Sequence, residues 1–184
     1  MADDRRDDPA TDTPADSESA ERPNAPTERD RLNDTSAYQR CFACGARNDA
    51  GLRLTFWHEG DAVVTEFTAT EAFQGFPGVV HGGILATLLD ETLNRTAMAE
   101  GRWTMTGRLD VRYRAPAPVG QTLRVTARPL SSRARMIHAS GEIRLKDAPH
   151  TVIATAEGLF MPVPGAYQRE ASDRFPEYAG FFDI

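Results

Sequence analysis

The fold is decided by residues 74–93, which read QGFPGVVHGGILATLLDETL. The first half of this stretch is rich in glycine and proline and is typical of turns. The second half carries apolar side chains at spacings of three and four residues, namely Ile84, Leu85, Leu88, Leu89 and Leu93. This spacing places them on one face of a helix. The pattern predicts a helix from residue 84 to a glycine C-cap near residue 101, with its apolar face buried.

The segments on either side of this helix have the composition of β-strands. Two runs before it, residues 52–57 and 62–67, are separated by a four-residue turn pattern that predicts a hairpin. Four runs follow it, at residues 108–113, 122–127, 135–145 and 151–160, with turns near residues 131–132 and 147–149. We therefore expect an α+β fold, in which an antiparallel sheet wraps around one long central helix.

The first 37 residues differ in composition from the rest of the chain. They hold eleven acidic and five basic side chains, so they carry the whole net charge of −6, and they include four prolines. Such a segment buries too little apolar surface to offset its ordering entropy, and we predict a disordered acidic tail over residues 1–37. One domain over residues 38–163 and a C-terminal extension over residues 164–184 are expected to follow. The remaining residues carry no net charge, which gives no reason to expect a nucleic-acid partner.

The longest apolar stretches are only a few residues, far below the length of a membrane span. No secretory pattern is present at the N-terminus, so the expected location is cytoplasmic, without a membrane partner. Cys41 and Cys44 form a CxxC pair, but a structural zinc site needs four ligands and the sequence contains no second pair. His58 and His150 are too scattered to complete a site, and we interpret this segment as a turn with two thiols.

The turn His81-Gly82-Gly83 lies directly before the predicted helix. Backbone N–H groups at a helix start have no intrahelical partner and lie at the positive end of the helix dipole. Glycines leave room for a substrate to approach them. Such a helix start polarises a carbonyl group and stabilises the oxyanion that forms when the carbonyl is attacked. The alternative interpretation is a tight loop that packs against a sheet, which would also explain two glycines.

Asp90 lies seven residues after Gly83, about two helical turns further along. It falls outside the apolar stripe, between Ala86 and Ala97, whose small side chains leave space for a ligand or a partner subunit. On composition alone, a solvated helix acid is the alternative. Glu91 faces another direction and has Arg95 four residues later as a pairing partner, so we interpret this pair as structural and on the helix surface.

The run from Gln74 to Asp90 resembles the signature of the hotdog-fold acyl-CoA thioesterases, and in particular the branch that contains phenylacetyl-CoA thioesterases. Residues 41–52 and 113–117 resemble segments that flank this signature in related proteins, so the resemblance covers roughly residues 38–163. It implies the hotdog fold and hydrolysis of an acyl-CoA thioester to a free acid and CoA. It also implies a homodimer or homotetramer, joined through edge strands, with each active site built from two protomers. No metal or redox cofactor is implied.

The resemblance also implies roles for individual residues. Gly82 corresponds to the principal oxyanion donor, with Gly83 second. Asp90 corresponds to the catalytic carboxylate, acting either as the nucleophile or as the base that deprotonates a water. His81 is expected to shape the loop rather than to bind a metal or act as a base. Thr106 corresponds to a Ser/Thr that supports the carboxylate, and we expect it to come from the other subunit.

The sequence evidence is weaker for two further groups of substrate-binding residues. The family often has an Asn or Gln six residues before the histidine; this position is Gly75 here, and the adjacent Gln74 is the candidate to replace it. Arg128, Arg133 and Arg135 cluster near a strand turn and are candidates to bind the phosphates of CoA, because guanidinium groups suit phosphate. Solvated arginines at a sheet edge are the alternative interpretation.

Two other functions stay open at this point. A hotdog domain can bind acyl-CoA without cleaving it, and the departure at Gly75 keeps this possibility alive. A hotdog dehydratase acting on 3-hydroxyacyl thioesters is the second alternative. That chemistry resembles sites with a different pairing of histidine and acid, which this sequence does not contain.

Overall fold

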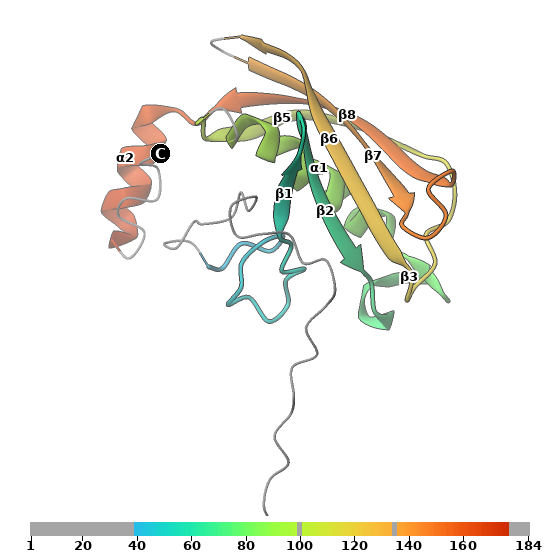
Figure 1. Ribbon diagram of the computed structural model, residues 1–184. Helices are drawn as coiled ribbons and strands as arrows, with labels where there is room; N and C mark the ends of the chain where they lie inside the picture. Colours follow the sequence, from blue (N-terminus) through green and yellow to red (C-terminus); the bar gives the residue numbers. More distant parts are fainter. Residues whose placement is uncertain (1–38, 99–100, 134–135, 177–184) are drawn as a thin grey trace, which may run out of the picture.

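A six-stranded antiparallel sheet curves around one long helix in the computed structural model of the chain (Figure 1). The structure describes residues 39–98, 101–133 and 136–176. The strands lie side by side in the order β1-β2-β6-β7-β8-β5. Their bounds are Phe56–Glu59 (β1), Ala62–Thr68 (β2), Thr104–Tyr113 (β5), Thr122–Arg133 (β6), Met136–Leu145 (β7) and Val152–Pro162 (β8). The predicted α+β architecture is confirmed.

The central helix α1 spans Gly82–Met98, two residues earlier at its start than the apolar spacing predicts. Gly101 has a φ of +70°, and its N–H donates to the Met98 carbonyl at 2.8 Å, which is the glycine C-cap that the sequence predicts. A 3-10 turn η2 (Glu71–Phe73) and a short hairpin of β3 (Gln74–Phe76) and β4 (Val79–Val80) precede α1. A second helix, α2 (Gly165–Arg174), follows the sheet. Neither helix is long and apolar enough, within the described residues, to cross a bilayer.

Two local predictions are wrong. Residues 52–55 are not strand, because the Leu52 and Leu54 N–H groups donate to the carbonyls of Phe42 and Ala43 in the preceding loop instead of to β2. Ser131 and Ser132 do not form a turn: they lie in β6, which extends to Arg133. An irregularity in the pairing with β7 between Pro129 and Ser131 lets the strand continue past the proline.

The apolar face of α1 packs on the concave side of the sheet. Leu85, Leu88, Leu89 and Leu93 are buried, as their spacing predicts. Leu93 lies close to β7: a Cβ atom added at Gly141 would lie only 2.6 Å from Leu93 Cδ1. Glycine at that position therefore lets the helix lie directly against the strand.

A second surface of α1 is covered by the N-terminal segment 41–54, through the buried side chains of Ala43, Leu52 and Leu54. The second half of the helix is therefore enclosed on more than its apolar face. The Glu91–Arg95 ion pair forms as predicted, at 2.6 Å, but the surface location predicted for it is wrong: the Arg95 side chain is only 5% exposed. The sequence of the helix alone does not show that another segment covers this face.

Candidate active site

The start of α1 is capped by His81. Its carbonyl accepts the N–H groups of Ile84 and Leu85, and its Nδ1 accepts the N–H of Gly83 at 2.9 Å. Because Nδ1 is the acceptor, the ring proton of a neutral His81 lies on Nε2. These hydrogen bonds of His81 hold the turn that opens the helix. The histidine also occupies the Gly83 amide, which was predicted as the second oxyanion donor.

The Gly82 amide differs from its neighbours. Within the part of the chain that the structure describes, no hydrogen bond engages the N–H of Gly82. The next peptide group, between Gly82 and Gly83, is held at both ends: the Tyr113 hydroxyl donates to the Gly82 carbonyl at 2.9 Å, and His81 holds the Gly83 N–H. This arrangement fixes the turn and leaves Gly82 as the donor available to a ligand.

Tyr113 is a residue that the sequence analysis did not single out for the site. It lies at the end of β5, where Leu109, Val111 and Tyr113 alternate with charged residues. This alternation directs Tyr113 to the face of the sheet that carries α1. The alternation indicates which face of the sheet carries the hydroxyl, but only the folded chain shows that it lies beside the glycine turn.

The packing around His81 explains why position 75 is glycine instead of the Asn or Gln that the family often has there. A Cβ atom added there would lie 3.1 Å from His81 Cδ2 and 3.2 Å from His81 Cα, so a side chain would press on the capping histidine. Gln74, the predicted substitute, accepts the N–H of Gly78 through its Oε1 at 3.2 Å, within its own hairpin. Among the described residues, no hydrogen bond joins Gln74 to Asp90.

Asp90 lies on α1 opposite strand β5. Its Oδ1 accepts a hydrogen bond from the Thr106 hydroxyl at 2.7 Å. Thr106 precedes an irregularity at Gly107 in the pairing of β5 with β8, and such bulges commonly redirect a side chain beside a functional site. The Asp90–Thr106 pair forms within one chain. The expectation that Thr106 comes from the other subunit is therefore wrong for this contact, because β5 runs along α1 of its own chain.

The environment of Asp90 favours reactivity. The side chain is half-buried, and this burial raises the pKa of its carboxyl group; the Thr106 hydrogen bond opposes the rise, and the negative charge of Glu91 adds to it. A carboxylate with a raised pKa is a stronger base than a solvated one. One turn later, Asn94 exchanges hydrogen bonds with Thr104 of β5, which holds the helix to the strand next to the carboxylate.

The two ends of the candidate site are far apart within one chain. Asp90 lies eight positions after Gly82 on α1, which corresponds to about 12 Å along the helix axis. An oxyanion donor must lie within hydrogen-bond distance of the carbonyl oxygen whose carbon is attacked. A single chain therefore does not bring the Gly82 amide and the Asp90 carboxylate to the same carbonyl group.

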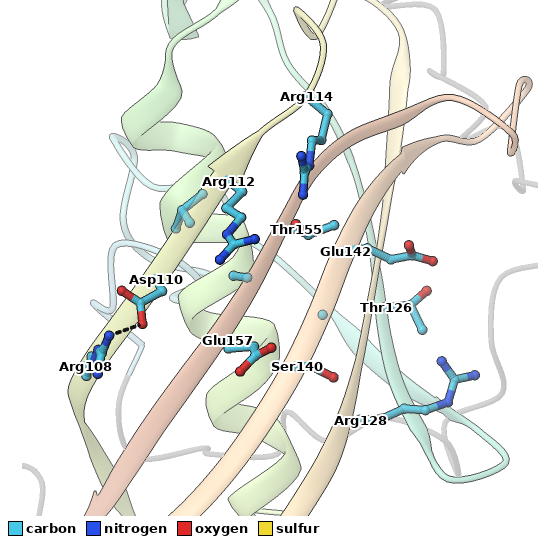
Figure 2. A pocket seen from close by; sticks show the side chains of 13 residues that line it. Arg108, Asp110, Arg112, Arg114, Thr126, Arg128, Ser140, Glu142, Thr155 and Glu157 are labelled. Atoms are coloured by element: carbon cyan, nitrogen blue, oxygen red, sulfur yellow. Dashed lines mark ion pairs between the residues drawn. The ribbon is translucent and has the colours of Figure 1, made fainter.

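The arginines predicted to bind CoA phosphates are only partly described. Arg135 and the side chain of Arg133 lie outside the described residues. Arg128 donates to Asp61 at 3.2 Å, between β6 and the turn that joins β1 to β2. Arg128 also lines a polar hollow on the face of the sheet opposite α1 (Figure 2).

This polar hollow, of about 690 Å³, lies on the face of the sheet opposite α1, away from Gly82 and Asp90 (Figure 2). Its acidic side chains are already paired: Asp110 with Arg108, Glu142 with Arg144 and Glu157 with His138. None of the residues predicted to be catalytic lines it. We assign no chemistry to this hollow.

Comparison with known proteins shows which family the chain resembles. Residues 77–150 match the model of the thioesterase superfamily. Acyl-coenzyme A thioesterase THEM4 of Bos taurus is 26% identical over 136 residues, which cover 73% of this chain and 54% of that protein. The match covers between 37% and 54% of the length of four such curated relatives.

Solved structures agree with this match. A crystal structure of a thioesterase superfamily protein is 33% identical, with a TM-score of 0.62, over 67% of this chain and 63% of that one. A Streptococcus mutans protein bound to acetyl CoA shares the fold, with a TM-score of 0.55 and 16% identity over 60% of this chain and 88% of that one. Over residues 77–150 the chain therefore matches the thioesterase superfamily, and its sheet and central helix form the hotdog fold.

Proposed function

We propose that this chain hydrolyses an acyl-CoA thioester to a free acid and CoA, at a site that two copies of the chain form together. The observation that carries the proposal is the half-buried carboxylate of Asp90, whose Oδ1 is held by Thr106. A free backbone donor at Gly82 supplies the second element that the reaction needs. The names of the curated relatives and the acetyl CoA bound to a protein of the same fold support acyl-CoA as the substrate class.

The chemistry follows from these groups. The Asp90 carboxylate either removes a proton from a water that attacks the thioester carbonyl, or attacks the carbonyl itself and is then released by water. The Gly82 N–H stabilises the negative charge that develops on the carbonyl oxygen. The bond between the carbonyl carbon and sulfur then breaks, and CoA leaves as the thiol or thiolate. Thr106 orients the carboxylate throughout.

The dimer in this proposal follows from the separation of Gly82 and Asp90 along α1. β5 is an edge strand of the six-stranded sheet, and large apolar side chains are exposed at this edge: Met105 of β5 is 44% exposed, and Met161, its partner in β8, is 55% exposed. An open edge with exposed apolar groups favours pairing with another strand. A second copy paired in antiparallel orientation along β5 would bring its Gly82 toward Asp90 of the first copy.

The test is a thiol-release assay of the full chain with a panel of aryl-CoA and fatty acyl-CoA substrates. We expect release of free CoA thiol with at least one acyl class. Calorimetry with a non-hydrolysable acyl-CoA analogue is run beside it. Binding of the analogue without thiol release from any substrate would contradict hydrolysis and favour a non-catalytic acyl-CoA-binding module.

Tyr113→Phe tests the role of the hydroxyl at the helix start. The variant loses the hydrogen bond to the Gly82 carbonyl but keeps the ring that lies against Gly82. We expect kcat to fall about 10-fold, because the turn that presents the oxyanion donor is held less firmly, with KM nearly unchanged. The Tm should change little, since the side chain is more than half exposed. An unchanged kcat would show that the hydroxyl does not position the Gly82 amide.

A further inference from the structure

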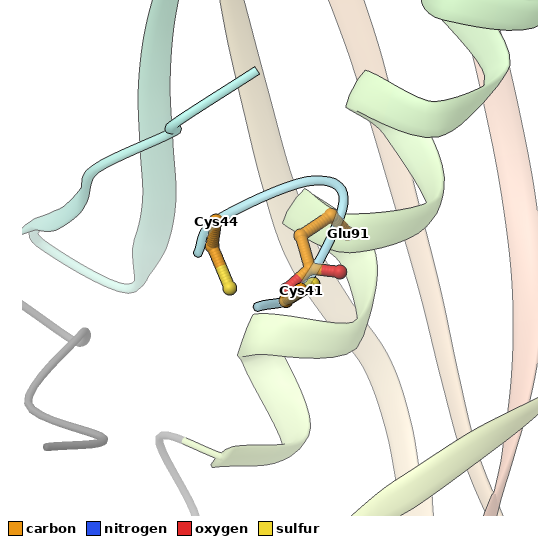
Figure 3. Close-up of side chains that lie close together, drawn as sticks. All are labelled: Cys41, Cys44 and Glu91. Carbon is orange, nitrogen blue, oxygen red and sulfur yellow. The ribbon is translucent and has the colours of Figure 1, made fainter. Parts of the chain in front are cut away.

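A cluster of two thiols and a carboxylate lies where segment 41–54 meets α1 (Figure 3). The sulfur atoms of Cys41 and Cys44 and a carboxylate oxygen of Glu91 all lie within 4.8 Å of one another, and all three side chains are half-buried. Glu91 is the third partner that the CxxC pair lacks in the sequence, where it lies 47 residues after Cys44. The proposed thioester hydrolysis uses none of these three groups.

The turn that carries the cysteines is built around the first sulfur. The Gly45 N–H donates to the Cys41 carbonyl at 2.9 Å, and a Cβ atom added at Gly45 would lie 2.5 Å from the Cys41 nitrogen, so the turn requires glycine there. The Cys44 thiol and the backbone amides of Cys44 and Ala43 donate hydrogen bonds to the Cys41 sulfur. Hydrogen bonds of this kind favour the thiolate, which is the form that binds metals.

Arg95 forms hydrogen bonds to two of the three side chains of the cluster. Its Nη2 donates both to Glu91 Oε1 at 2.6 Å and to Cys44 Sγ at 2.9 Å, and its guanidinium group lies over the Phe56 ring. This fixes the carboxylate and the second sulfur through donors that are not themselves ligands, while Glu91 Oε2 is not engaged by Arg95. Hydrogen bonds of this kind orient the ligands in metal sites.

The charge balance of the ligated cluster suits a divalent cation. With an ion bound, Cys44 gives up its proton, and the two thiolates and one carboxylate carry three negative charges against the one positive charge of Arg95. An ion of charge +2 neutralises the remaining two.

We propose that Cys41, Cys44 and Glu91 bind one Zn²⁺ ion. The described residues supply these three ligands, water takes the fourth position, and Arg95 holds two of the ligands in place. Zn–S bonds of about 2.3 Å in tetrahedral geometry place two sulfur atoms about 3.8 Å apart, within the spread of this cluster. Thiolate ligands select zinc over magnesium or calcium. The ion links segment 41–54 to α1 at the residue that follows Asp90.

The test is a metal titration of the full chain, reduced and treated with a chelator beforehand. We expect one equivalent of Co²⁺ to bind per chain with the near-ultraviolet absorption of thiolate-to-cobalt charge transfer, and one equivalent of Zn²⁺ to abolish that absorption. Cys44→Ser and Glu91→Gln should each weaken Zn²⁺ binding, by about 100-fold and about 10-fold. Asp49→Asn is the matched control, because this acid lies in the same segment, is fully exposed and pairs with Arg53; its affinity should equal that of the parent.

If a variant fails to fold, the metal titration of the parent chain alone tests the proposal. Absence of charge-transfer absorption and of bound Zn²⁺ at equimolar metal, in the reduced parent, would overturn it. A mass lower by two hydrogens in the freshly purified chain, with no bound metal after reduction, would identify Cys41 and Cys44 as a disulfide-forming pair instead. Equal Zn²⁺ affinity of the Glu91→Gln variant and the parent would exclude the carboxylate as a ligand and also overturn the three-ligand site.

Discussion

Asp90→Asn is expected to lower kcat for thioester hydrolysis by about 10³-fold, because an amide is neither a base nor a nucleophile at this position. Asparagine has the shape of aspartate and keeps an oxygen that accepts the Thr106 hydroxyl. KM should therefore change little, and the loss should appear in kcat. The measurement is the steady-state rate of thiol release with the acyl-CoA that the parent cleaves fastest.

The stability of this variant provides a second readout. Burial raises the pKa of Asp90, so its charged form is less favourable in the folded chain than in the unfolded one at neutral pH. A neutral amide removes that cost, and the Tm should stay constant or rise. Asp61→Asn is the control for a general charge effect, since Asp61 is exposed and pairs with Arg128. Activity of Asp90→Asn within tenfold of the parent would remove the carboxylate from the mechanism.

Much of the fold could be predicted because it rests on local patterns. The three- and four-residue spacing of leucines identifies α1, and the alternation of Leu109, Val111 and Tyr113 identifies β5. The errors arise where hydrogen bonding between distant segments determines the local structure. Residues 52–55 have strand composition, yet their amides bond to the loop at residues 42–43, and only the folded chain shows this competition.

The candidate site, too, could be predicted where it depends on local sequence, but not where it depends on contacts between distant residues. His81, Gly82 and Asp90 belong to one continuous stretch whose pattern indicates their chemistry. The hydrogen bond from Tyr113 to Gly82 joins residues 31 positions apart, and no spacing rule predicts it. The engagement of the Gly83 amide by His81 depends on the rotamer of one ring. The burial of Glu91 and Arg95 depends on segment 41–54, and the apolar pattern of the helix does not indicate that this segment covers them.

Gly82→Ala is expected to lower kcat/KM by about 100-fold, which is the usual cost of losing an oxyanion donor. A Cβ atom at Gly82 has room within the chain, since its nearest neighbours are atoms of the Tyr113 ring and hydroxyl at 3.5 Å. The variant should therefore fold with a Tm close to that of the parent. Its methyl group would lie beside the free Gly82 N–H and hinder the thioester oxygen from reaching it. Parent-like activity would contradict the assignment of this amide.

The central claim is that Gly82 of one copy and Asp90 of another act on the same thioester. Its most direct test is a hybrid dimer of one Asp90→Asn chain and one Gly82→Ala chain, co-expressed with two affinity tags and purified through both. A site shared between copies leaves one of the two sites intact, so the hybrid should show about half of the parent activity although each variant alone is nearly inactive. A hybrid as inactive as its two components would contradict the account, because each site would then draw both groups from a single chain.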